Sequence, residues 1–319
     1  INYIVSQQAK KKFPESKFLL RIEDTDKKRS KDQFKENIIN GLNWMGINYD
    51  GEPYIQSHKI IRHQEVALEL LKRKKAFKCV CTNETLEKKR IFNRKNKINN
   101  KKICEICEND IKIQSLKKDF VIRIKIPDQG ISSINDEIQG KIKVKNQEID
   151  NFILTRKDGS PTYMLSVVVD DFDMGVNLII RGDDHFNNLF RQKFIYENMG
   201  WDIPKYAHLS LIHGNDGKKL SKRHGSVDIN EFKEKGYLRK SIINNLILLG
   251  WSNNTKNEFI EINEIIDNFN INKLSKSSSI FSYEKLNFFN NYFINKDKNY
   301  YEFFKYCKIN KKLESYLNQ

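Results

Sequence analysis

The sequence predicts an α/β fold built around a parallel β-sheet. Short apolar runs at residues 18–22 and 177–180 are typical of buried strands. Residues 31–45 and 57–72 carry apolar side chains at helical spacing. Strands and helices alternate on both sides of residues 75–147, whose composition is different. This alternation favours a parallel sheet whose sequence is interrupted by an insertion or a small separate domain.

The first elements follow from local patterns. Residues 2–12 predict the last part of a helix, and the buried strand at 18–22 ends in the acidic turn Glu23-Asp24-Thr25-Asp26. Each of the two helices after it is expected to bury one face. The apolar side chains of these faces are Phe34, Ile38, Leu42 and Met45 in the first helix, and Ile61, Val66 and Leu70 in the second.

The middle of the chain is basic, contains cysteines and then becomes strand-like. Residues 88–118 hold eleven Lys and Arg against three acids, which indicates either a phosphate-binding surface or a solvated loop. Residues 120–126 and 140–144 predict strands. A strand at 152–154, a helix that includes 165–169 and a helix at 187–199 follow. A strand is predicted at 207–212, and helical periodicity dominates from Asn230 onward.

The composition limits the class of protein. The chain has 319 residues and a net charge of +16 at pH 7, from 57 Lys and Arg against 41 Asp and Glu. This excess indicates a polyanionic partner, or else the drift towards Lys, Asn and Ile of an AT-rich genome. The 20 Phe and 13 Tyr argue against disorder, and five cysteines are too few for a disulfide scaffold. We expect neither a secretory signal nor a transmembrane span, because no apolar run approaches about 18 residues.

A basic loop at residues 217–225, Gly-Lys-Lys-Leu-Ser-Lys-Arg-His-Gly, is the strongest local signal. Glycines at both ends permit a tight, mobile loop. Lysine and arginine on such a loop can stabilise charge that grows on a phosphate chain, because one charge pair at ~4 Å contributes about 4 kcal/mol at an effective dielectric near 20. A solvated basic turn is the alternative. The spacing excludes a P-loop, which needs Gly-x4-Gly-Lys-Ser/Thr.

A second polar motif follows the strand at 177–180. It consists of Arg181, Gly182, Asp183, Asp184 and His185. In open α/β sheets, ligands bind at the carboxyl ends of the parallel strands, and this is where the motif is expected to lie. Arg181 is suited to bidentate pairing with a substrate carboxylate. The paired aspartates also suggest metal-dependent phosphoryl transfer of the polymerase type, which the strand–helix alternation disfavours.

Two further motifs have both a structural and a functional interpretation. Tyr163 follows the turn Asp158-Gly159-Ser160-Pro161 near a predicted helix start, where it is either a core residue or a substrate contact. Four cysteines fall in two close pairs, Cys79-x-Cys81 and Cys104-x2-Cys107, which is the count for a tetrahedral zinc site. Cys307 stands apart and is expected to be an ordinary buried thiol.

Together these motifs resemble bacterial glutamyl-tRNA synthetases, over roughly residues 1–300. The resemblance lies in residues 20–26, 158–163, 168–171, 180–185 with Arg191-Gln192, and 219–225, in the order of the family. It implies a class I Rossmann-type, parallel-sheet catalytic domain, split by an α+β acceptor-stem-binding insert and followed by a helical stem-contact domain. The implied domains are 1–74 (catalytic, first half), 75–151 (insert with zinc site), 152–214 (catalytic, second half), 215–298 (lysine loop and stem contact) and 299–319 (start of the anticodon-binding domain).

The resemblance implies a glutamate–tRNA ligase that activates glutamate with ATP and Mg²⁺ and transfers it to the 3′ end of tRNA-Glu. Glu23, Tyr163 and Arg181 would contact L-glutamate, with Arg181 on its side-chain carboxylate. Asp184 and His185 would lie near ATP, with Lys222 and Arg223. Lys219, Ser221, Lys222 and Arg223 would form the catalytic phosphate loop, with Lys222 the key cation. Cys79, Cys81, Cys104 and Cys107 match the region where some members hold structural Zn²⁺, and the last two differ from the common ligand pattern. A cytoplasmic monomer is expected, although no sequence feature encodes the oligomeric state.

One departure from the family affects activity. The family's opening strand, with an Arg and a Ser for glutamate, and its His-Ile-Gly-His-like ATP motif have no counterpart here, and the chain ends where the anticodon-binding domain should begin. We therefore expect residues 1–319 to be a fragment, truncated at both ends and inactive in aminoacylation by itself. The alternatives are a glutaminyl enzyme, a tRNA-modifying paralogue, or a zinc-bearing tRNA-binding module without catalysis.

Overall fold

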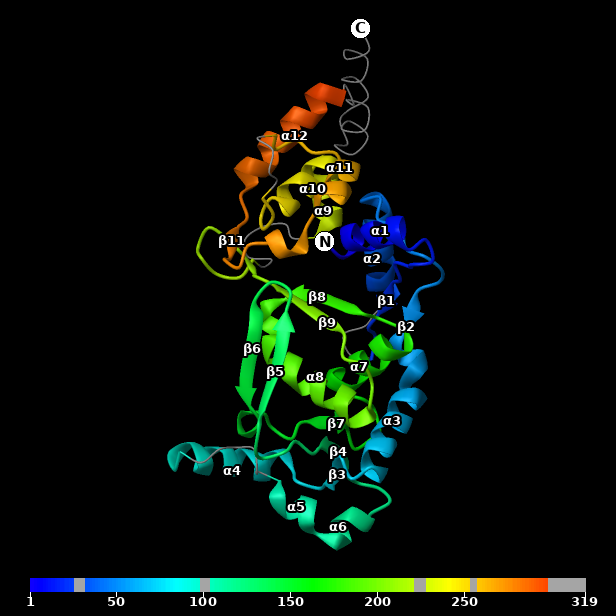
Figure 1. The fold of residues 1–319 in the computed structure, drawn as a ribbon, viewed down its shortest axis with the longest axis vertical. Coiled ribbons are helices and arrows are strands. Elements are labelled where there is room, and N and C mark those ends of the chain that lie inside the picture. Colours follow the sequence, from blue (N-terminus) through cyan, green and yellow to red (C-terminus); the bar gives the residue numbers. More distant parts are fainter. Residues whose placement is uncertain (26–31, 98–103, 221–227, 253–256, 298–319) are drawn as a thin grey trace. The chain divides into compact units, whose positions relative to one another are not determined.

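The computed structural model describes residues 1–25, 32–97, 104–220, 228–252 and 257–297. The chain forms two compact units, whose elements are labelled in Figure 1. The chain passes between the units several times, so each unit combines segments that are distant in sequence. The five-domain division stays a prediction. The first unit comprises Ile1–Leu20, Lys31–Pro53 and Leu209–Gln319, and the second comprises Arg21–Ser30 and Tyr54–His208.

A four-stranded sheet lies in the second unit. Its order is β6–β5–β9–β8, from β5 (Ile131–Asp136), β6 (Gly140–Lys145), β8 (Leu178–Gly182) and β9 (Lys205–Leu209). β5 and β6 form an antiparallel hairpin. β5 runs parallel to β9 where Asp136 lies opposite Tyr206. A hairpin from the predicted insertion therefore extends the sheet that carries Arg181 on β8.

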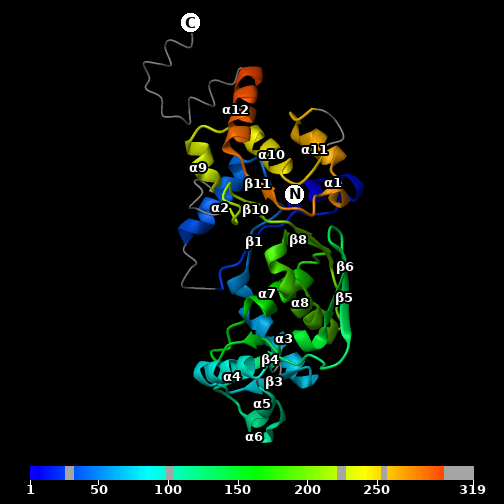
Figure 2. The same ribbon diagram turned by 90° about the vertical axis from the view of Figure 1, so that its left-hand side faces the viewer.

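Three helices contribute to the core of the second unit: α3 (Ile60–Lys72), α7 (Tyr163–Asp173) and α8 (Phe186–Met199). Figures 1 and 2 both place α7 and α8 on the same side of the β5–β6 hairpin. Helix α8 ends at Gly200, whose φ of 72° is the left-handed conformation that favours glycine. The shared core takes residues from the predicted insertion and from its flanks, among them Leu70, Ile122, Ile124, Leu154, Leu165, Val169, Leu189, Ile195 and Tyr206.

A second sheet holds the cysteine region. Strands β3 (Ala76–Cys79), β4 (Val121–Ile124) and β7 (Ile153–Thr155) pair antiparallel in the order β3–β4–β7. Helices α4 (Asn83–Lys95), α5 (Glu105–Asn109) and α6 (Ile111–Ser115) lie around β3 (Figure 2). Thr82 caps α4, because its hydroxyl accepts from the Thr85 amide. A small separate core joins these elements through Phe77, Cys79, Leu86, Cys104 and Cys107.

The first unit is mainly helical, as the periodicity after Asn230 predicts. Its helices are α1 (Asn2–Lys12), α2 (Asp32–Trp44), α9 (Ile229–Glu234), α10 (Arg239–Ile247), α11 (Ile262–Asn268) and α12 (Tyr283–Asp297). The strands β10 (Ile212–His213) and β11 (Ser279–Ile280) pair parallel. A hydrophobic core in this unit contains Met45, Phe232, Ile242, Phe281 and Leu286. Across the described ranges, every helix is too short or too polar to cross a bilayer.

The helices predicted by periodicity are confirmed, whereas three details of the first elements are wrong. Ile38, expected on the buried face of α2, is 50% exposed. The strand expected at 18–22 is only β1 (Arg21–Ile22), paired parallel with β2 (Tyr54–Ile55), and Leu19 is 39% exposed. The first turn expected for the second helix is instead a 3-10 segment (Gln56–Lys59), so that α3 begins at Ile60. Ile61, expected on its buried face, is 72% exposed, since that face holds His63, Val66, Ala67 and Leu70. The strand predicted at 207–212 divides into β9 and β10. The α/β architecture with parallel strand pairs is confirmed.

Candidate functional site

Arg181 is the centre of a polar cluster in the second unit. It lies near the carboxyl end of β8, next to the short 3-10 segment Asp183–His185. Its Nε donates to His208 Nε2 at 3.1 Å, and its Nη1 donates to Gln192 Oε1 at 2.7 Å. Nη2 lies 3.5 Å from the His185 carbonyl oxygen, and the Tyr206 ring centroid lies 5.4 Å from the guanidinium carbon. The guanidinium is therefore oriented before any ligand binds.

His208 and Asp136 extend this cluster away from the arginine. His208 Nδ1 lies 2.7 Å from Asp136 Oδ2, and both side chains are fully buried. Burial opposes ionisation of Asp136, but hydrogen bonds from His208 and from the Gln139 and Ile138 amides lower its pKa below the ordinary value. Asp136 is consequently a buried carboxylate within a continuous hydrogen-bonded path to Arg181.

The other predicted residues of this motif lie close to Arg181. Tyr163 is the first residue of α7 and is 36% exposed, and its ring centroid lies 6.0 Å from that of His185. Burial raises the pKa of Tyr163, so its hydroxyl stays protonated. His185 Nε2 and Asp184 Oδ1 are 3.9 Å apart, and both side chains are partly exposed. A partly open surface with a phenol, an imidazole and a carboxylate therefore lies beside the half-buried arginine.

Glu23 is held by an arginine that the sequence patterns did not single out. Arg21 Nη2 lies 3.1 Å from Glu23 Oε1, and its Nη1 lies 2.6 Å from Asp171 Oδ1. Burial raises the pKa of Asp171, although Arg21 counteracts this effect. Arg21 thus connects the acidic turn to α7, the helix that carries Tyr163.

A buried hydrogen-bond network around Asp170 fixes the same turn. Asp170 Oδ1 lies 2.7 Å from His63 Nε2 and accepts from the Tyr54 hydroxyl at 3.1 Å, while Oδ2 accepts from Gln56 Nε2 at 2.7 Å. Burial, and the nearby Asp170 charge, raise the pKa of Tyr54. Gln56 also accepts from the Thr25 hydroxyl at 3.2 Å. Sequence reasoning missed His63 and Gln56. His63 gave one signal, a polar residue on the apolar face of α3 that carries Val66 and Leu70, and the polar run around Gln56 gave none.

Three buried polar atoms near Arg181 have unused hydrogen-bonding capacity. Gln192 Nε2 and the hydroxyls of Tyr196 and Tyr206 find no partner within the ranges that the structure describes. Gln192 and Tyr206 both contact Arg181, as described above, and Tyr196 interacts electrostatically with Asp171. Because buried polar atoms are normally paired, the unused atoms indicate a polar ligand or ordered water at this place.

Only the start of the basic loop is described, and it lies in the first unit. Lys219 forms an antiparallel bridge with His213, and the Leu220 amide donates to the Ile212 carbonyl at 2.8 Å. Gly217 takes the left-handed φ of 71° in the turn before them. Ser221, Lys222 and Arg223 lie outside the described residues, as do Asp26 and Cys307.

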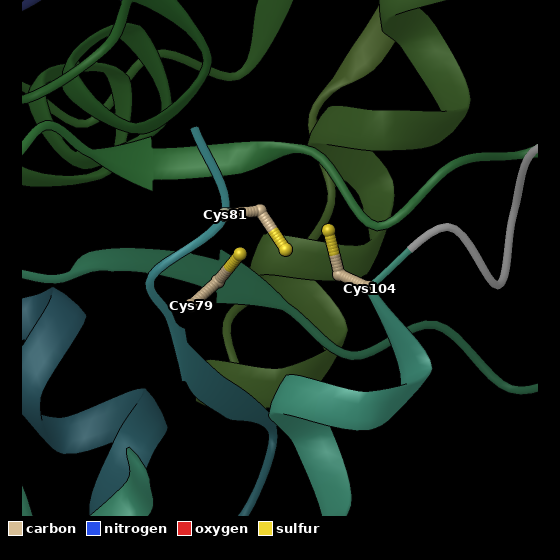
Figure 3. Close-up of side chains that lie close together, drawn as sticks. All are labelled: Cys79, Cys81 and Cys104. Carbon is tan, nitrogen blue, oxygen red and sulfur yellow. The ribbon is translucent and has the colours of Figure 1, made fainter. Parts of the chain in front are cut away.

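The four paired cysteines come together at one end of the second unit. The sulfur atoms of Cys79, Cys81 and Cys104 lie within 4.8 Å of one another, and Figure 3 shows all three directed toward a common point. Cys81 Sγ is 3.5 Å from Cys107 Sγ. A hydrogen bond from the Cys104 thiol, with the Arg123 charge nearby, lowers the pKa of Cys79 to about 4, whereas burial raises the pKa of Cys81 to about 11. The geometry suits a four-thiolate metal site.

Comparisons with known proteins show the family of the chain. The sequence profile for tRNA synthetases class I (E and Q), catalytic domain, matches residues 2–288. Glutamate–tRNA ligase 1 of Ehrlichia canis is 43% identical over 279 residues, which is 88% of this chain and 59% of that protein. Glutamate–tRNA ligase 1 of Erythrobacter litoralis is 45% identical over 276 residues, covering 85% of this chain and 57% of that protein.

Solved structures give the same result. The crystal structure of a glutamate tRNA ligase from Elizabethkingia meningosepticum, in complex with its amino acid, matches with a TM-score of 0.81 and 29% identity. Glutamate-tRNA synthetase from Elizabethkingia anophelis matches with a TM-score of 0.82 and 30% identity. Each match covers 92% of this chain and 66% of the other chain. The chain thus spans less than two thirds of the length of these relatives.

Proposed function

The chain belongs to the class I tRNA synthetases of the glutamyl and glutaminyl type, and from this membership we propose that the protein is a glutamate–tRNA ligase. It would activate glutamate with ATP to glutamyl-adenylate, release pyrophosphate, and transfer the glutamyl group to the 3′ end of tRNA-Glu. The names of the relatives support the choice of amino acid. The observation that carries the proposal is the oriented guanidinium of Arg181, which suits a carboxylate better than an uncharged carboxamide.

The proposed roles follow from charge and hydrogen bonding. Arg181 would bind the side-chain carboxylate of glutamate through the Nη N–H groups that its protein contacts leave unused. The Glu23 carboxylate has the right charge for the α-ammonium group, and Arg21 holds it in place. The protonated Tyr163 hydroxyl would donate a hydrogen bond to the bound amino acid.

Adenylate formation requires control of phosphate charge. The α-carboxylate of glutamate attacks the α-phosphorus of ATP, and pyrophosphate leaves with the electron pair of the broken bond. Asp184 and His185 would contact ATP, while Lys219, Ser221, Lys222 and Arg223 would bind its phosphates. Mg²⁺, when bound, would neutralise part of the phosphate charge. Lysine and arginine act most strongly where charge grows on the leaving pyrophosphate, so Lys222 is the proposed key cation.

We also propose that Cys79, Cys81, Cys104 and Cys107 hold a structural Zn²⁺. Closely spaced thiols fit this ion, because soft thiolate ligands favour zinc and four of them complete its tetrahedral shell. Zinc would stabilise the small core around β3 and α5. Metal analysis of freshly purified protein tests the proposal: about one zinc per chain is expected, and metal-free protein of full stability would overturn it.

The proposed macromolecular partner is tRNA-Glu, with the second unit contributing basic side chains. Helix α4 carries Lys88, Lys89, Arg90, Arg94 and Lys95, which add to the net charge of +16. Phosphate contacts of this kind make affinity fall steeply with salt. Since this activity serves protein synthesis, a cytoplasmic location is part of the proposal, as is a monomeric state.

Amino-acid-dependent pyrophosphate exchange, with the full-length protein and tRNA-Glu present, tests the function directly. Glutamate should support exchange and glutamine should not. Lys222→Ala should lower the exchange rate by about 10²- to 10³-fold, because it removes charge stabilisation in the transition state, and should change tRNA affinity less than about twofold. The exposed Lys235 provides the control, and K235A should behave as wild type. Exchange supported by glutamine alone would contradict the proposal.

A further inference from the structure

Arg181 depends on a residue that no motif identified. Its Nε has one N–H, which is donated to His208 Nε2 at 3.1 Å. The Nε bond fixes the rotation of the guanidinium plane, and the Gln192 contact to Nη1 fixes the same plane from a second side. In the described part of the chain, these contacts and the His185 carbonyl engage one N–H on each nitrogen. A second N–H on Nη1 and on Nη2 then remains for a ligand.

His208 can accept this bond in only one tautomer. Nε2 must carry a lone pair, so the ring proton must lie on Nδ1. Nδ1 lies 2.7 Å from Asp136 Oδ2, and the ionised carboxylate accepts a hydrogen bond from the Nδ1–H group. The carboxylate thus selects the tautomer that Arg181 requires, because a proton on Nε2 would oppose the Nε–H of the arginine.

Asp136 is itself held with little freedom. Its Oδ1 accepts from the backbone amides of Ile138 and Gln139 at 3.0 and 2.9 Å. Both carboxylate oxygens lie within 3.2 Å of the His208 amide nitrogen. These contacts place the carboxylate at the end of β5, beside β9. Asp136 belongs to residues 75–151, the segment that the sequence assigns to an acceptor-stem-binding insert.

We propose that Asp136 and His208 are positioning residues that hold Arg181 in the orientation needed to bind the side-chain carboxylate of glutamate, so that the β5–β6 hairpin contributes to amino-acid selection. The inference rests on the proposed function, because it needs glutamate as the ligand of Arg181. It adds two residues that touch neither glutamate nor ATP and act only through the arginine. Their loss should therefore affect glutamate binding more than ATP binding.

Three variants of the full-length protein test the proposal in aminoacylation assays with tRNA-Glu. His208→Leu removes the acceptor and should raise KM for glutamate at least tenfold, with KM for ATP within twofold of wild type. His208→Gln keeps a donor for Asp136 and an acceptor for Arg181, and should recover most of the loss. Asp136→Asn should resemble H208L, because its amide group turns a donor toward His208 and reverses the tautomer, as happens in a serine-protease triad.

A control variant separates positioning from general damage to the hairpin. Ser132 lies on β5 and donates to Asn146 Oδ1 at 2.8 Å, so Ser132→Ala also removes a buried hydrogen bond. S132A should leave KM for glutamate within twofold of wild type. Equal rises of KM for glutamate and for ATP in H208L and D136N would overturn the proposal, as would an unchanged KM for glutamate in both. If H208L does not fold, H208Q and D136N still test the proposal, because KM for glutamate should stay near the wild-type value in H208Q and rise in D136N.

The ring tautomer gives a readout that is independent of turnover. In wild type, ¹⁵N NMR of the His208 ring should show the proton on Nδ1, and in D136N it should show the proton on Nε2. Wild-type His208 with its proton on Nε2 would refute the inference even if activity were normal. Failure of the proposed function is distinguishable, because wild-type protein would then show no glutamate-dependent charging while the tautomer remained measurable.

Discussion

The N–H groups of Arg181 find hydrogen-bond acceptors within the protein itself, whereas the cysteine cluster brings together four thiol groups, which are all of the same chemical kind. The guanidinium has a histidine, a glutamine and a carbonyl as partners, and the histidine is fixed by a carboxylate. In the cysteine cluster, the sulfur atoms of Cys81 and Cys107 lie 3.5 Å apart, and those of Cys79, Cys81 and Cys104 lie within 4.8 Å of one another. The first cluster is organised before its ligand arrives, and the second is expected to become ordered with its metal.

Replacing the arginine should give the largest effect of this comparison. Arg181→Ala should lower kcat/KM for glutamate by about 10³-fold, or roughly 4 kcal/mol, because the substrate carboxylate loses a half-buried charged partner that is already oriented. The measurement is aminoacylation of tRNA-Glu by the full-length protein. Arg62, whose ion pair with Asp173 is exposed, provides the control, and R62A should stay within twofold of wild type. A similar loss in both variants would contradict the special role of Arg181.

Removing the Asp170 carboxylate should mainly affect stability. Asp170→Ala leaves the buried His63 and Gln56 and the partly buried Tyr54 without their shared acceptor, so the free energy of unfolding should fall by about 3 kcal/mol. Urea unfolding followed by circular dichroism measures the change. Asp158 is a matched control, because it also accepts two hydrogen bonds but is exposed. D158A should lose less than about 1 kcal/mol, and an equal loss in both variants would show that burial is unimportant here.

Metal removal should distinguish the two clusters next. If Zn²⁺ is present at 100 times its Kd, a strong chelator should lower the free energy of unfolding by about 2.7 kcal/mol. Thermal melts with and without chelator test this, and R181A should respond as wild type does. Cys104→Ser should respond much less, because it has already lost a ligand. If the chelator leaves the melting temperature of wild type unchanged, the cysteine cluster does not depend on a metal, which would contradict the contrast with the Arg181 cluster.

Sequence patterns predicted the parts of both clusters that local spacing encodes. The cysteine pairs and Arg181 at a strand end were visible, as were the helices with regular apolar spacing. The remainder depended on contacts between distant residues. Asp136 and His208 are 72 positions apart in the sequence. Because β5 carries polar side chains on both of its faces, Asp136 does not stand out there, and neither residue predicted a site. His63 and Gln56 likewise become partners of Asp170 only when the chain folds.

The smallest expected effect concerns the pH dependence of Asp136. Hydrogen bonds lower its pKa in the folded protein, so their stabilising contribution is present above the unfolded value, which is about 3.9, and is lost as pH falls through the folded value. Wild type should therefore exceed D136N in stability by a constant amount above about pH 5, and the gap should narrow in acid. The effect is limited because burial of the carboxylate offsets part of the gain.

Urea unfolding of wild type and D136N between pH 3 and pH 7 measures this gap. Asp202 is exposed in the loop after α8, so D202N should track wild type at every pH. A gap that widens in acid would mean that Asp136 is protonated in the folded state. In that case the carboxylate could not fix the proton of His208 on Nδ1, and Arg181 would be held only by Gln192 and the His185 carbonyl. The Arg181 cluster would then resemble the cysteine cluster in needing its ligand for order.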